Sequence, residues 1–294
     1  MWHVGTTYYD KTHRNKAYRK WCVWVNIGLI DVDGKFPKQD YVLCSSHGKD
    51  SLATLRAIEF LKWPLTRIVH VEVWATKDIP AELPPMVEFK KKADAIIKER
   101  WGIEVEHISA DVTYEEQFYK VFQDGKNKGR IYGWPFLKGP WCNSRLKIDA
   151  INKIKINGIE YIGLAADESK RFKVLSDTKL SPLKELGWEE DLCGLWCKYN
   201  DLLSPTYDSS CRGGCWFCHN QGVEQLRLLR KNYPQYWELM LKWEKDSPVS
   251  FKPDGRTVHD FERRFQAEDE GLISPDKYFR WDMLDKPLQF SIMF

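Results

Sequence analysis

The pattern of apolar positions predicts alternating strands and helices from residue 41 onward. Short apolar runs predict strands at 41–44, 67–75, 103–108 and 160–164. Apolar residues at helical spacing predict helices at 50–62, 84–101 and 144–157. Such alternation is typical of a Rossmann-like α/β domain, in which helices cover both faces of a parallel sheet. In these sheets ligands bind beyond the carboxyl ends of the strands.

The pattern becomes mainly helical toward the C-terminus. It predicts one or two short helices over 181–204, a long amphipathic helix over 224–244, another over 259–268 and an irregular tail over 271–294. Residues 124–142 are rich in glycine and aromatic residues and predict a long loop. We therefore expect an N-terminal extension over 1–37, a nucleotide-binding domain over 38–205 and a cysteine-containing helical region over 206–294.

Composition places the chain among ordinary globular proteins. Its 294 residues are 43% hydrophobic and 30% charged, and no apolar run approaches the ~20 residues of a membrane helix. The first residues lack the apolar core of a secretory signal, so a cytoplasmic location without membrane contact is expected. The net charge of +3 does not by itself indicate nucleic-acid binding. The basic clusters at 11–20 and 126–130 are interpreted first as solvated surface. We also expect a homo-oligomer.

The end of the first predicted strand is a candidate anion site. An apolar run stops at Cys44, small and polar residues follow, and a helix is predicted from Asp50. The first backbone N–H groups of a helix lack internal partners, and the helix dipole adds positive charge there. Gly48 permits a tight backbone path and Lys49 adds a full positive charge. This loop is not a Walker A motif, because Leu43 replaces its first glycine and Asp50 follows the lysine.

The hexapeptide from Ser46 to Ser51 resembles the PP-loop signature of the ATP pyrophosphatases, with His47 at a position where glycine is usual. That superfamily includes phosphoadenosine phosphosulfate (PAPS) reductases, tRNA thiolases and DNA phosphorothioation enzymes. The segment beginning at Cys142, with Arg145 and Lys147, resembles a second motif of the PAPS reductase family. The segment from Gly163 to Arg171 resembles that family's second nucleotide-binding segment.

Two further segments, 203–205 and 214–218, strengthen the likeness to a PAPS-reductase-like group often met in phage genomes. The resemblance implies an adenine nucleotide, either ATP or the sulfonucleotides PAPS and APS. It implies catalytic roles for Lys49, Asp50 and Arg171. It implies cofactor contacts from Ser46, His47, Gly48, Lys49, Asp50, Ser51, Gly163, Asp167, Glu168 and Arg171. Asp50 suits either Mg²⁺ binding or capping of the helix.

Clustered cysteines form the second candidate site. The chain has eight cysteines: Cys22, Cys44, Cys142, Cys193, Cys197, Cys211, Cys215 and Cys218. A chain of this length needs no disulfides, so clustered thiols in a cytosolic protein indicate a metal. Cys215 and Cys218 have ligand spacing, Cys142 is the expected distant partner and Cys211 the fourth ligand. Cys193 and Cys197, four residues apart on a predicted helix, are a competing source of ligands.

Zinc and a [4Fe–4S] cluster both accept four cysteines. Trp216 and Phe217 favour the cluster because they would surround it with apolar side chains, and the resembling families also often carry one. If only three cysteines bind, one iron stays open. The spacing from Cys211 to Cys218 also matches the radical-SAM signature. That interpretation is disfavoured, because the motif is expected after the first strand of a barrel.

The position of the last cysteine distinguishes sulfonucleotide reduction from ATP-dependent activation of a substrate. Sulfonucleotide reductases carry a nucleophilic cysteine in a C-terminal tail, whereas no cysteine follows Cys218 here. The leading hypothesis is therefore an ATP-using PP-loop enzyme that activates a substrate by adenylation for sulfur transfer, with nucleic acid as a candidate substrate and a sulfur donor as a partner. The alternatives are a PAPS or APS reductase that uses an external thiol such as a thioredoxin, and a non-catalytic nucleotide- or nucleic-acid-binding phage accessory protein.

Overall fold

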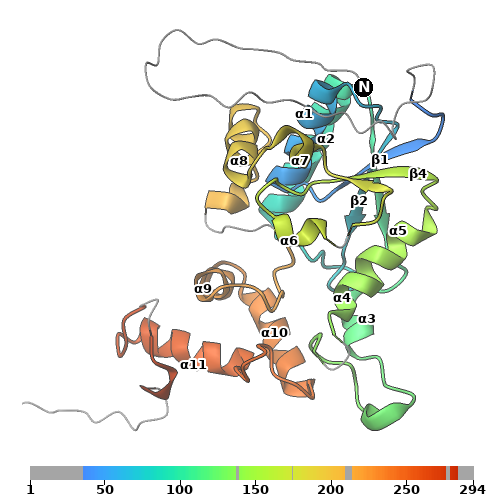
Figure 1. Ribbon diagram of the computed structural model, residues 1–294. Helices are drawn as coiled ribbons and strands as arrows, with labels where there is room; N and C mark the ends of the chain where they lie inside the picture. The colour runs from blue at the N-terminus through green and yellow to red at the C-terminus, as the bar shows by residue number, and fades with distance from the viewer. Residues whose placement is uncertain (1–35, 137–138, 174, 209–213, 276–278, 284–294) are drawn as a thin grey trace, which may run out of the picture. The chain divides into compact units, whose positions relative to one another are not determined.

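The computed structural model describes residues 36–136, 139–173, 175–208, 214–275 and 279–283 (Figure 1). The expectations for almost all of the N-terminal extension, for Cys22 and for Cys211 lie outside these residues. No described helix has both the length and the apolar character needed to cross a membrane.

A five-stranded sheet in the order β3-β2-β1-β4-β5 confirms the predicted α/β fold class. Its strands are β1 (Asp40–Ser45), β2 (Arg67–Glu72), β3 (Val105–Ser109), β4 (Gly158–Ile162) and β5 (Lys179–Leu180). β1 pairs in parallel with β2 and β4, and β4 pairs in parallel with β5. β5 was not predicted, because two residues are too few to show a periodic pattern.

The period of two along β1 sends alternate side chains to opposite faces of the sheet. Tyr41 and Leu43 belong to one buried apolar cluster together with Leu52 and Leu55 of α1 (Lys49–Leu61). Three more helices contribute to the same cluster: α2 (Pro84–Trp101), α7 (Pro182–Leu186) and α8 (Glu190–Tyr199). This packing fixes α1 directly behind the strand whose carboxyl end carries the predicted phosphate loop.

Two compact units make up the chain, and each is discontinuous in sequence. The first comprises residues up to Val71, Pro85–Ile108 and Ile151–Tyr207, and the second comprises Glu72–Pro84, Ser109–Ala150 and Asp208–Phe294. This division differs from the contiguous one expected from the sequence. Residues 109–150 carry aromatic side chains that pack with those of the C-terminal helices, so they join that unit rather than the sheet.

The predicted helix over 224–244 is two helices, α9 (Val223–Asn232) and α10 (Pro234–Asp246). Pro234 separates them, because proline has no N–H to donate and its ring clashes with the preceding turn. The predicted helix over 144–157 ends at Lys153. It begins as a π-helical stretch at Ser144–Ile148 that continues directly into α5 (Asp149–Lys153). The predicted helix over 259–268 is confirmed as α11 (Val258–Asp269).

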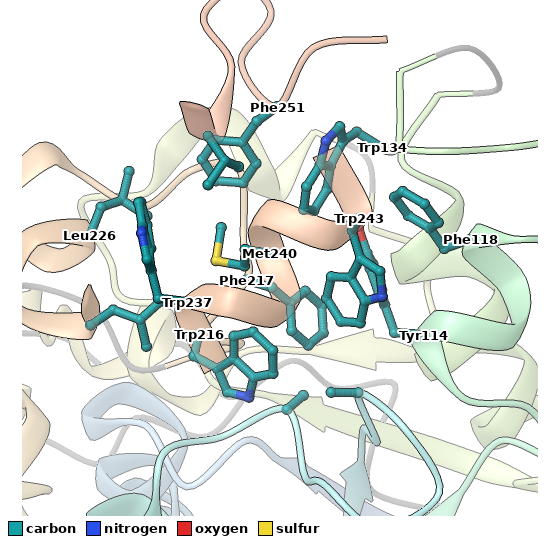
Figure 2. Close-up of a cluster of buried hydrophobic side chains, with 14 of the residues drawn as sticks. Tyr114, Phe118, Trp134, Trp216, Phe217, Leu226, Trp237, Met240, Trp243 and Phe251 are labelled. Atoms are coloured by element: carbon teal, nitrogen blue, oxygen red, sulfur yellow. The ribbon is translucent and has the colours of Figure 1, made fainter. Parts of the chain in front are cut away.

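Short elements complete the described chain. They are α3 (Tyr114–Phe118), η2 (Gly125–Asn127), α4 (Trp141–Asn143), α6 (Ser169–Phe172), η4 (Pro205–Asp208) and η5 (Trp281–Met283). The second unit is held together by an aromatic core, shown in Figure 2. The rings of Trp216 and Trp243 stack with centroids 5.7 Å apart, and those of Tyr114 and Phe217 lie 4.1 Å apart. Aromatic pairs of this kind stabilise a core beyond the area that they bury.

Glu244 places a carboxylate in this aromatic core. It accepts hydrogen bonds from Trp134 Nε1 at 2.9 Å and from the Val258 amide at 3.2 Å. Burial raises the pKa of Glu244 from 4.5 to about 7, against the effect of these hydrogen bonds. The folded protein therefore holds a proton that the unfolded chain releases between these two pH values.

Because the folded protein binds this proton more tightly, its free energy of unfolding is expected to fall as the pH rises from 4.5 to about 7. For the wild-type protein the decrease in unfolding free energy attributable to Glu244 amounts to about 3 kcal/mol between pH 4.5 and 7. Glu244→Gln keeps the acceptor oxygen but has no proton to lose, so its urea unfolding curve should depend less on pH. Tryptophan fluorescence during unfolding at pH 5 and pH 8 measures the difference. Parallel pH dependence in both proteins would contradict the prediction.

Candidate nucleotide loop and cysteine site

In the first unit, the loop between β1 and α1 is closed by two serine hydroxyls. Ser46 Oγ lies 3.1 Å from Ser51 Oγ, and Ser51 Oγ donates to the Gly48 carbonyl at 3.0 Å. The Gly48 amide donates to Ser46 Oγ at 3.3 Å. Gly48 is the N-cap of α1, so these bonds form where the helix dipole is positive. The serines expected to contact phosphate therefore also fix the shape of the loop.

The left-handed residue of this loop is His47, whereas at Gly48 a side chain would be crowded, as the sequence suggested. His47 has φ of 54°, whereas Gly48 has φ of −76°, a value that any residue adopts. A Cβ at Gly48 would instead lie 3.3 Å from Ser46 Oγ and 3.4 Å from the Tyr207 hydroxyl, so the restriction there is crowding. The imidazole of His47 is fully buried, so its contact with a nucleotide is limited to the backbone.

Lys49 stands between two carboxylates at the start of α1. Its Nζ lies 2.7 Å from Asp50 Oδ1 and 2.9 Å from Glu190 Oε2, and its side chain is 14% exposed. Burial acts to lower the pKa of Lys49, but hydrogen bonds with Asp50 and Glu190 raise it above its ordinary value. Lys49 is thus a cation held at the loop. Glu190, on α8, was not predicted because nothing local in the sequence links it to position 49.

Asp50 contacts Lys49 Nζ rather than a backbone amide at the helix start. Burial raises the pKa of Asp50, and Lys49 opposes that effect. The Lys49 amide donates instead to the Tyr207 hydroxyl at 3.3 Å. Of the two roles expected from the sequence, capping therefore has no support in these contacts, and binding of a divalent cation remains.

The segment after β4 lies against the same loop. A Cβ at Gly163 would come within 2.5 Å of Ser51 Cα and 2.6 Å of its amide nitrogen. Only glycine allows this approach of two backbones. Further along, Asp167 Oδ1 accepts from the Glu190 amide at 3.3 Å. The structure thus brings Gly163 and Asp167 to the neighbourhood of Lys49.

Two other predicted residues of this segment pair with each other. Arg171 Nη1 donates to Glu168 Oε1 at 2.5 Å, and Glu168 Oε2 accepts from the Ala165 amide at 3.3 Å. The Arg171 side chain is 62% exposed, so it is open to solvent at this position. Glu168 holds the turn that follows β4, and its charge also acts on Asp50.

The close approach of Gly163 to Ser51 predicts that adding one methyl group at position 163 lowers both stability and ATP affinity. Gly163→Ala should push the start of α1 away from β4, lowering the unfolding free energy by about 2 kcal/mol and weakening ATP binding. Gly194→Ala is the matched control, because a Cβ there meets Lys49 Cδ at an ordinary 3.6 Å. Urea unfolding and ATP titration of both variants measure the effects. Equal behaviour of the two variants would contradict the role assigned to Gly163.

The competing cysteines, Cys193 and Cys197, belong to the core of the first unit. Both are fully buried on α8, and Cys197 Sγ donates to the Lys49 carbonyl at 3.2 Å. Burial raises the pKa of each thiol to about 12, so both are neutral at ordinary pH. These thiols pack α8 against α1, and neither is among the residues that line the cavity of the other cysteines.

In the second unit, Cys142, Cys215 and Cys218 line one cavity of about 230 Å³. Cys142 lies on α4, and the other two lie on a turn in which the Cys218 amide donates to the Cys215 carbonyl at 3.1 Å. Gly214, with φ of 145°, gives this turn a backbone conformation that side chains disfavour. The predicted distant partner and the Cys-x2-Cys pair thus meet at one cavity.

The three thiols act on one another electrostatically. Burial first, and then the charge of Cys218, raises the pKa of Cys142. Burial raises the pKa of Cys215 to about 12, while the positive charge of Lys147 acts to lower it. As thiolates, these groups would need a compensating cation, because unpaired buried charge is costly. A bound metal would supply that charge.

At least two of the three sulfurs lie farther apart than the ligand atoms of one tetrahedral zinc ion. Tetrahedral zinc would hold its cysteine sulfurs about 3.8 Å apart. Among the described residues, no group of three ligand atoms within 4.8 Å of one another includes these cysteines. A cluster gives each thiolate its own iron and so keeps the sulfurs farther apart. Tyr114, Phe217 and Leu146 supply apolar walls to the cavity. Cys211, the expected fourth ligand, lies outside the described residues.

Lys252 holds the chain that follows Cys218. Its Nζ donates to the carbonyls of His219 at 2.5 Å and Gln221 at 2.6 Å. Burial lowers the pKa of Lys252 to about 8, and the nearby charge of Arg256 acts in the same direction. This contact was not predicted, because lysine is most often a solvated surface residue.

Comparison with protein-family models gave no match. Comparison with curated proteins also gave none. Among solved structures, the chain is similar to the U34-tRNA thiolase NcsA from Methanococcus maripaludis, determined with its [4Fe–4S] cluster. The identity is 15% and the TM-score 0.37, over 81% of this chain and 85% of that chain. A likeness at this level assigns no family, and function is inferred below from the residues of this chain.

Proposed function

We propose that the protein is an ATP-using enzyme of the PP-loop type that adenylates a substrate for sulfur transfer and carries a [4Fe–4S] cluster. The observation that carries the proposal is the presence, in one chain, of a lysine-bearing anion loop and a cavity lined by three cysteines. Adenylation needs the first feature, and cluster-dependent sulfur chemistry needs the second.

The loop suits the handling of a pyrophosphate leaving group. In the proposed step, a substrate oxygen forms a bond to the α-phosphorus of ATP and the bond from that phosphorus to the β-bridging oxygen breaks. Pyrophosphate leaves with the electron pair of that bond. A sulfide-level sulfur later attacks the adenylated carbon, so a carbon–sulfur bond forms while the carbon–oxygen bond breaks and AMP leaves with its electron pair. Lys49 and the start of α1 would neutralise the developing charge, as is usual in phosphoryl chemistry, and Arg171 would add a second cation.

The carboxylates around Lys49 support a role for Mg²⁺. Asp50 and Glu190 both contact Lys49 Nζ, and Asp167 accepts from the Glu190 amide. Without a second cation, these groups would repel the incoming triphosphate. Asp50 would bind Mg²⁺, since carboxylate oxygen is the ligand that this ion prefers.

In the second unit, Cys142, Cys215 and Cys218 would hold the cluster, with Cys211 as the predicted fourth ligand. When bound, the cluster would supply an iron able to hold sulfur if one position stays free of cysteine. Other residues of the chain would keep water away from the sulfurs and position the backbone. Tyr114 and Phe217 exclude water from the sulfurs, and Lys252 fixes the backbone just after Cys218.

The test is product analysis with anaerobically prepared, iron-loaded protein. ATP labelled at the α-phosphate is supplied with Mg²⁺, a sulfide or persulfide donor, and RNA or DNA in separate reactions. The proposal predicts AMP and pyrophosphate that depend on a nucleic-acid substrate. Formation of ADP and phosphate would contradict it. Sulfite release from PAPS with thioredoxin would favour the reductase instead, and tight ATP binding without any turnover would favour a binding module.

A further inference from the structure

A buried network of histidines surrounds His47, the residue that departs from the glycine of the PP-loop signature. His47 Nδ1 lies 3.1 Å from His70 Nδ1, and His47 Nε2 lies 2.7 Å from Asp94 Oδ1. His107 Nε2 lies 2.9 Å from the other oxygen of Asp94. Lys90 Nζ lies 3.3 Å from His70 Nε2. All five residues belong to the first unit.

The protons of this network have one consistent arrangement, which begins at the Ser45 carbonyl. That oxygen lies 2.9 Å from His70 Nδ1 and can only accept, so His70 Nδ1 carries a proton. His70 Nδ1 then also donates to His47 Nδ1, which must accept. His47 therefore carries its proton on Nε2 and donates it to Asp94. His70 Nε2 is left as the acceptor for Lys90.

The pKa shifts of His70 and Asp94 agree with this arrangement of protons. Burial, together with the positive charge of Lys90, lowers the pKa of His70 to about 2, so His70 is neutral. Burial acts to raise the pKa of Asp94, but the hydrogen bonds from His47 and His107 lower it, so Asp94 is ionised. The Lys90 ammonium beside His70 disfavours a metal ion among these histidines.

The network explains how a histidine occupies the left-handed turn of the loop. A residue with a side chain is disfavoured at φ of 54° unless its surroundings hold it there. The imidazole of His47 is fully buried and bound at both nitrogens. It is thus fixed to β2 through His70 and to α2 through Asp94, one residue before the N-cap of α1.

We propose that His47 is a positioning residue: its imidazole, held between His70 and Asp94, keeps the loop in the turn that sets the first residues of α1 for phosphate. This inference rests on the proposed nucleotide binding and deepens it. It assigns to a buried hydrogen-bond network the conformational role that glycine has in the PP-loop signature. Phosphate affinity then depends on side chains that never touch the ligand.

A pair of substitutions at one position tests this role. His47→Ala removes the imidazole and keeps a Cβ, whereas His47→Gly removes both and enters the left-handed region freely. Binding of inorganic pyrophosphate and of α,β-methylene-ATP is measured by calorimetry with Mg²⁺. We expect about tenfold weaker binding for His47→Ala and binding within about threefold of wild type for His47→Gly.

Asp94→Asn is a second variant that leaves residue 47 unchanged. The amide presents one oxygen where the carboxylate presents two, so one of the two imidazoles loses its acceptor. We expect binding to weaken by about threefold.

The outcomes separate the two proposals. Wild-type protein that binds neither ligand would overturn the proposed nucleotide binding. Wild-type binding together with unchanged binding by His47→Ala would overturn the positioning role alone. Equal weakening in His47→Ala and His47→Gly would also overturn it, because glycine then would not replace the network. Thermal unfolding of each variant identifies any that fails to fold, and Asp94→Asn then carries the comparison.

Discussion

Replacing Lys49 by alanine is expected to weaken ATP binding and substrate-dependent pyrophosphate release by about 100-fold or more. The ammonium is the cation nearest the start of α1, and it contacts Asp50 at 2.7 Å and Glu190 at 2.9 Å. Its removal takes one positive charge from the phosphates and also leaves two carboxylates facing them. The two effects act in the same direction, so the loss should exceed that of a single hydrogen bond.

Lys198→Ala is the control for this substitution. Lys198 lies on α8, the helix that carries Glu190, but its side chain is exposed. Calorimetric titration with ATP and Mg²⁺, and release of labelled pyrophosphate, compare the two variants with wild type. Full affinity or full activity in Lys49→Ala would contradict a role for the loop in ATP binding. An equal loss in Lys198→Ala would indicate a general effect of charge.

Replacing Cys215 by alanine is expected to lower bound iron to below about a tenth of the wild-type content, because a cluster loses its stability with a missing ligand. Cys142→Ala should have the same effect, although Cys142 is far away in the sequence. Both residues line the cavity of the second unit. Iron and acid-labile sulfide, measured after anaerobic purification, report the outcome.

Two other cysteines serve as controls. Cys44 lies on β1 and Cys193 on α8, both in the first unit. Neither Cys44 nor Cys193 is among the residues that line the cavity of the second unit. Cys44→Ala and Cys193→Ala should keep wild-type iron. Retention of iron by Cys215→Ala, or its loss from either control, would contradict the ligand assignment.

Local patterns predicted the parts of the fold that depend on neighbouring residues. The strand, tight loop and helix from Tyr41 to Leu61 follow from apolar spacing and helix-start chemistry, and α2 has the predicted bounds. Pro234 has an equally local effect, but the apolar stripe running through it led to one long helix being predicted instead of two. The two-residue β5 was missed because its apolar pattern is too short.

The sequence predicted only those site residues that share a segment or a motif. Lys49 and Asp50 were predicted from the loop, but Glu190 was not, because it meets Lys49 through the packing of α8 on α1. Asp94 and His70 likewise reach His47 from different elements of the first unit. The sequence also did not predict the left-handed conformation of His47. The buried network that favours this conformation appears only in three dimensions.

The most direct test of the account is the metal content of wild-type protein prepared without oxygen. A bound [4Fe–4S] cluster predicts about four iron and four sulfide per chain, with a brown colour that bleaches on reduction. Zinc at about one equivalent per chain, or protein free of both metals after reconstitution with iron and sulfide, would contradict the account.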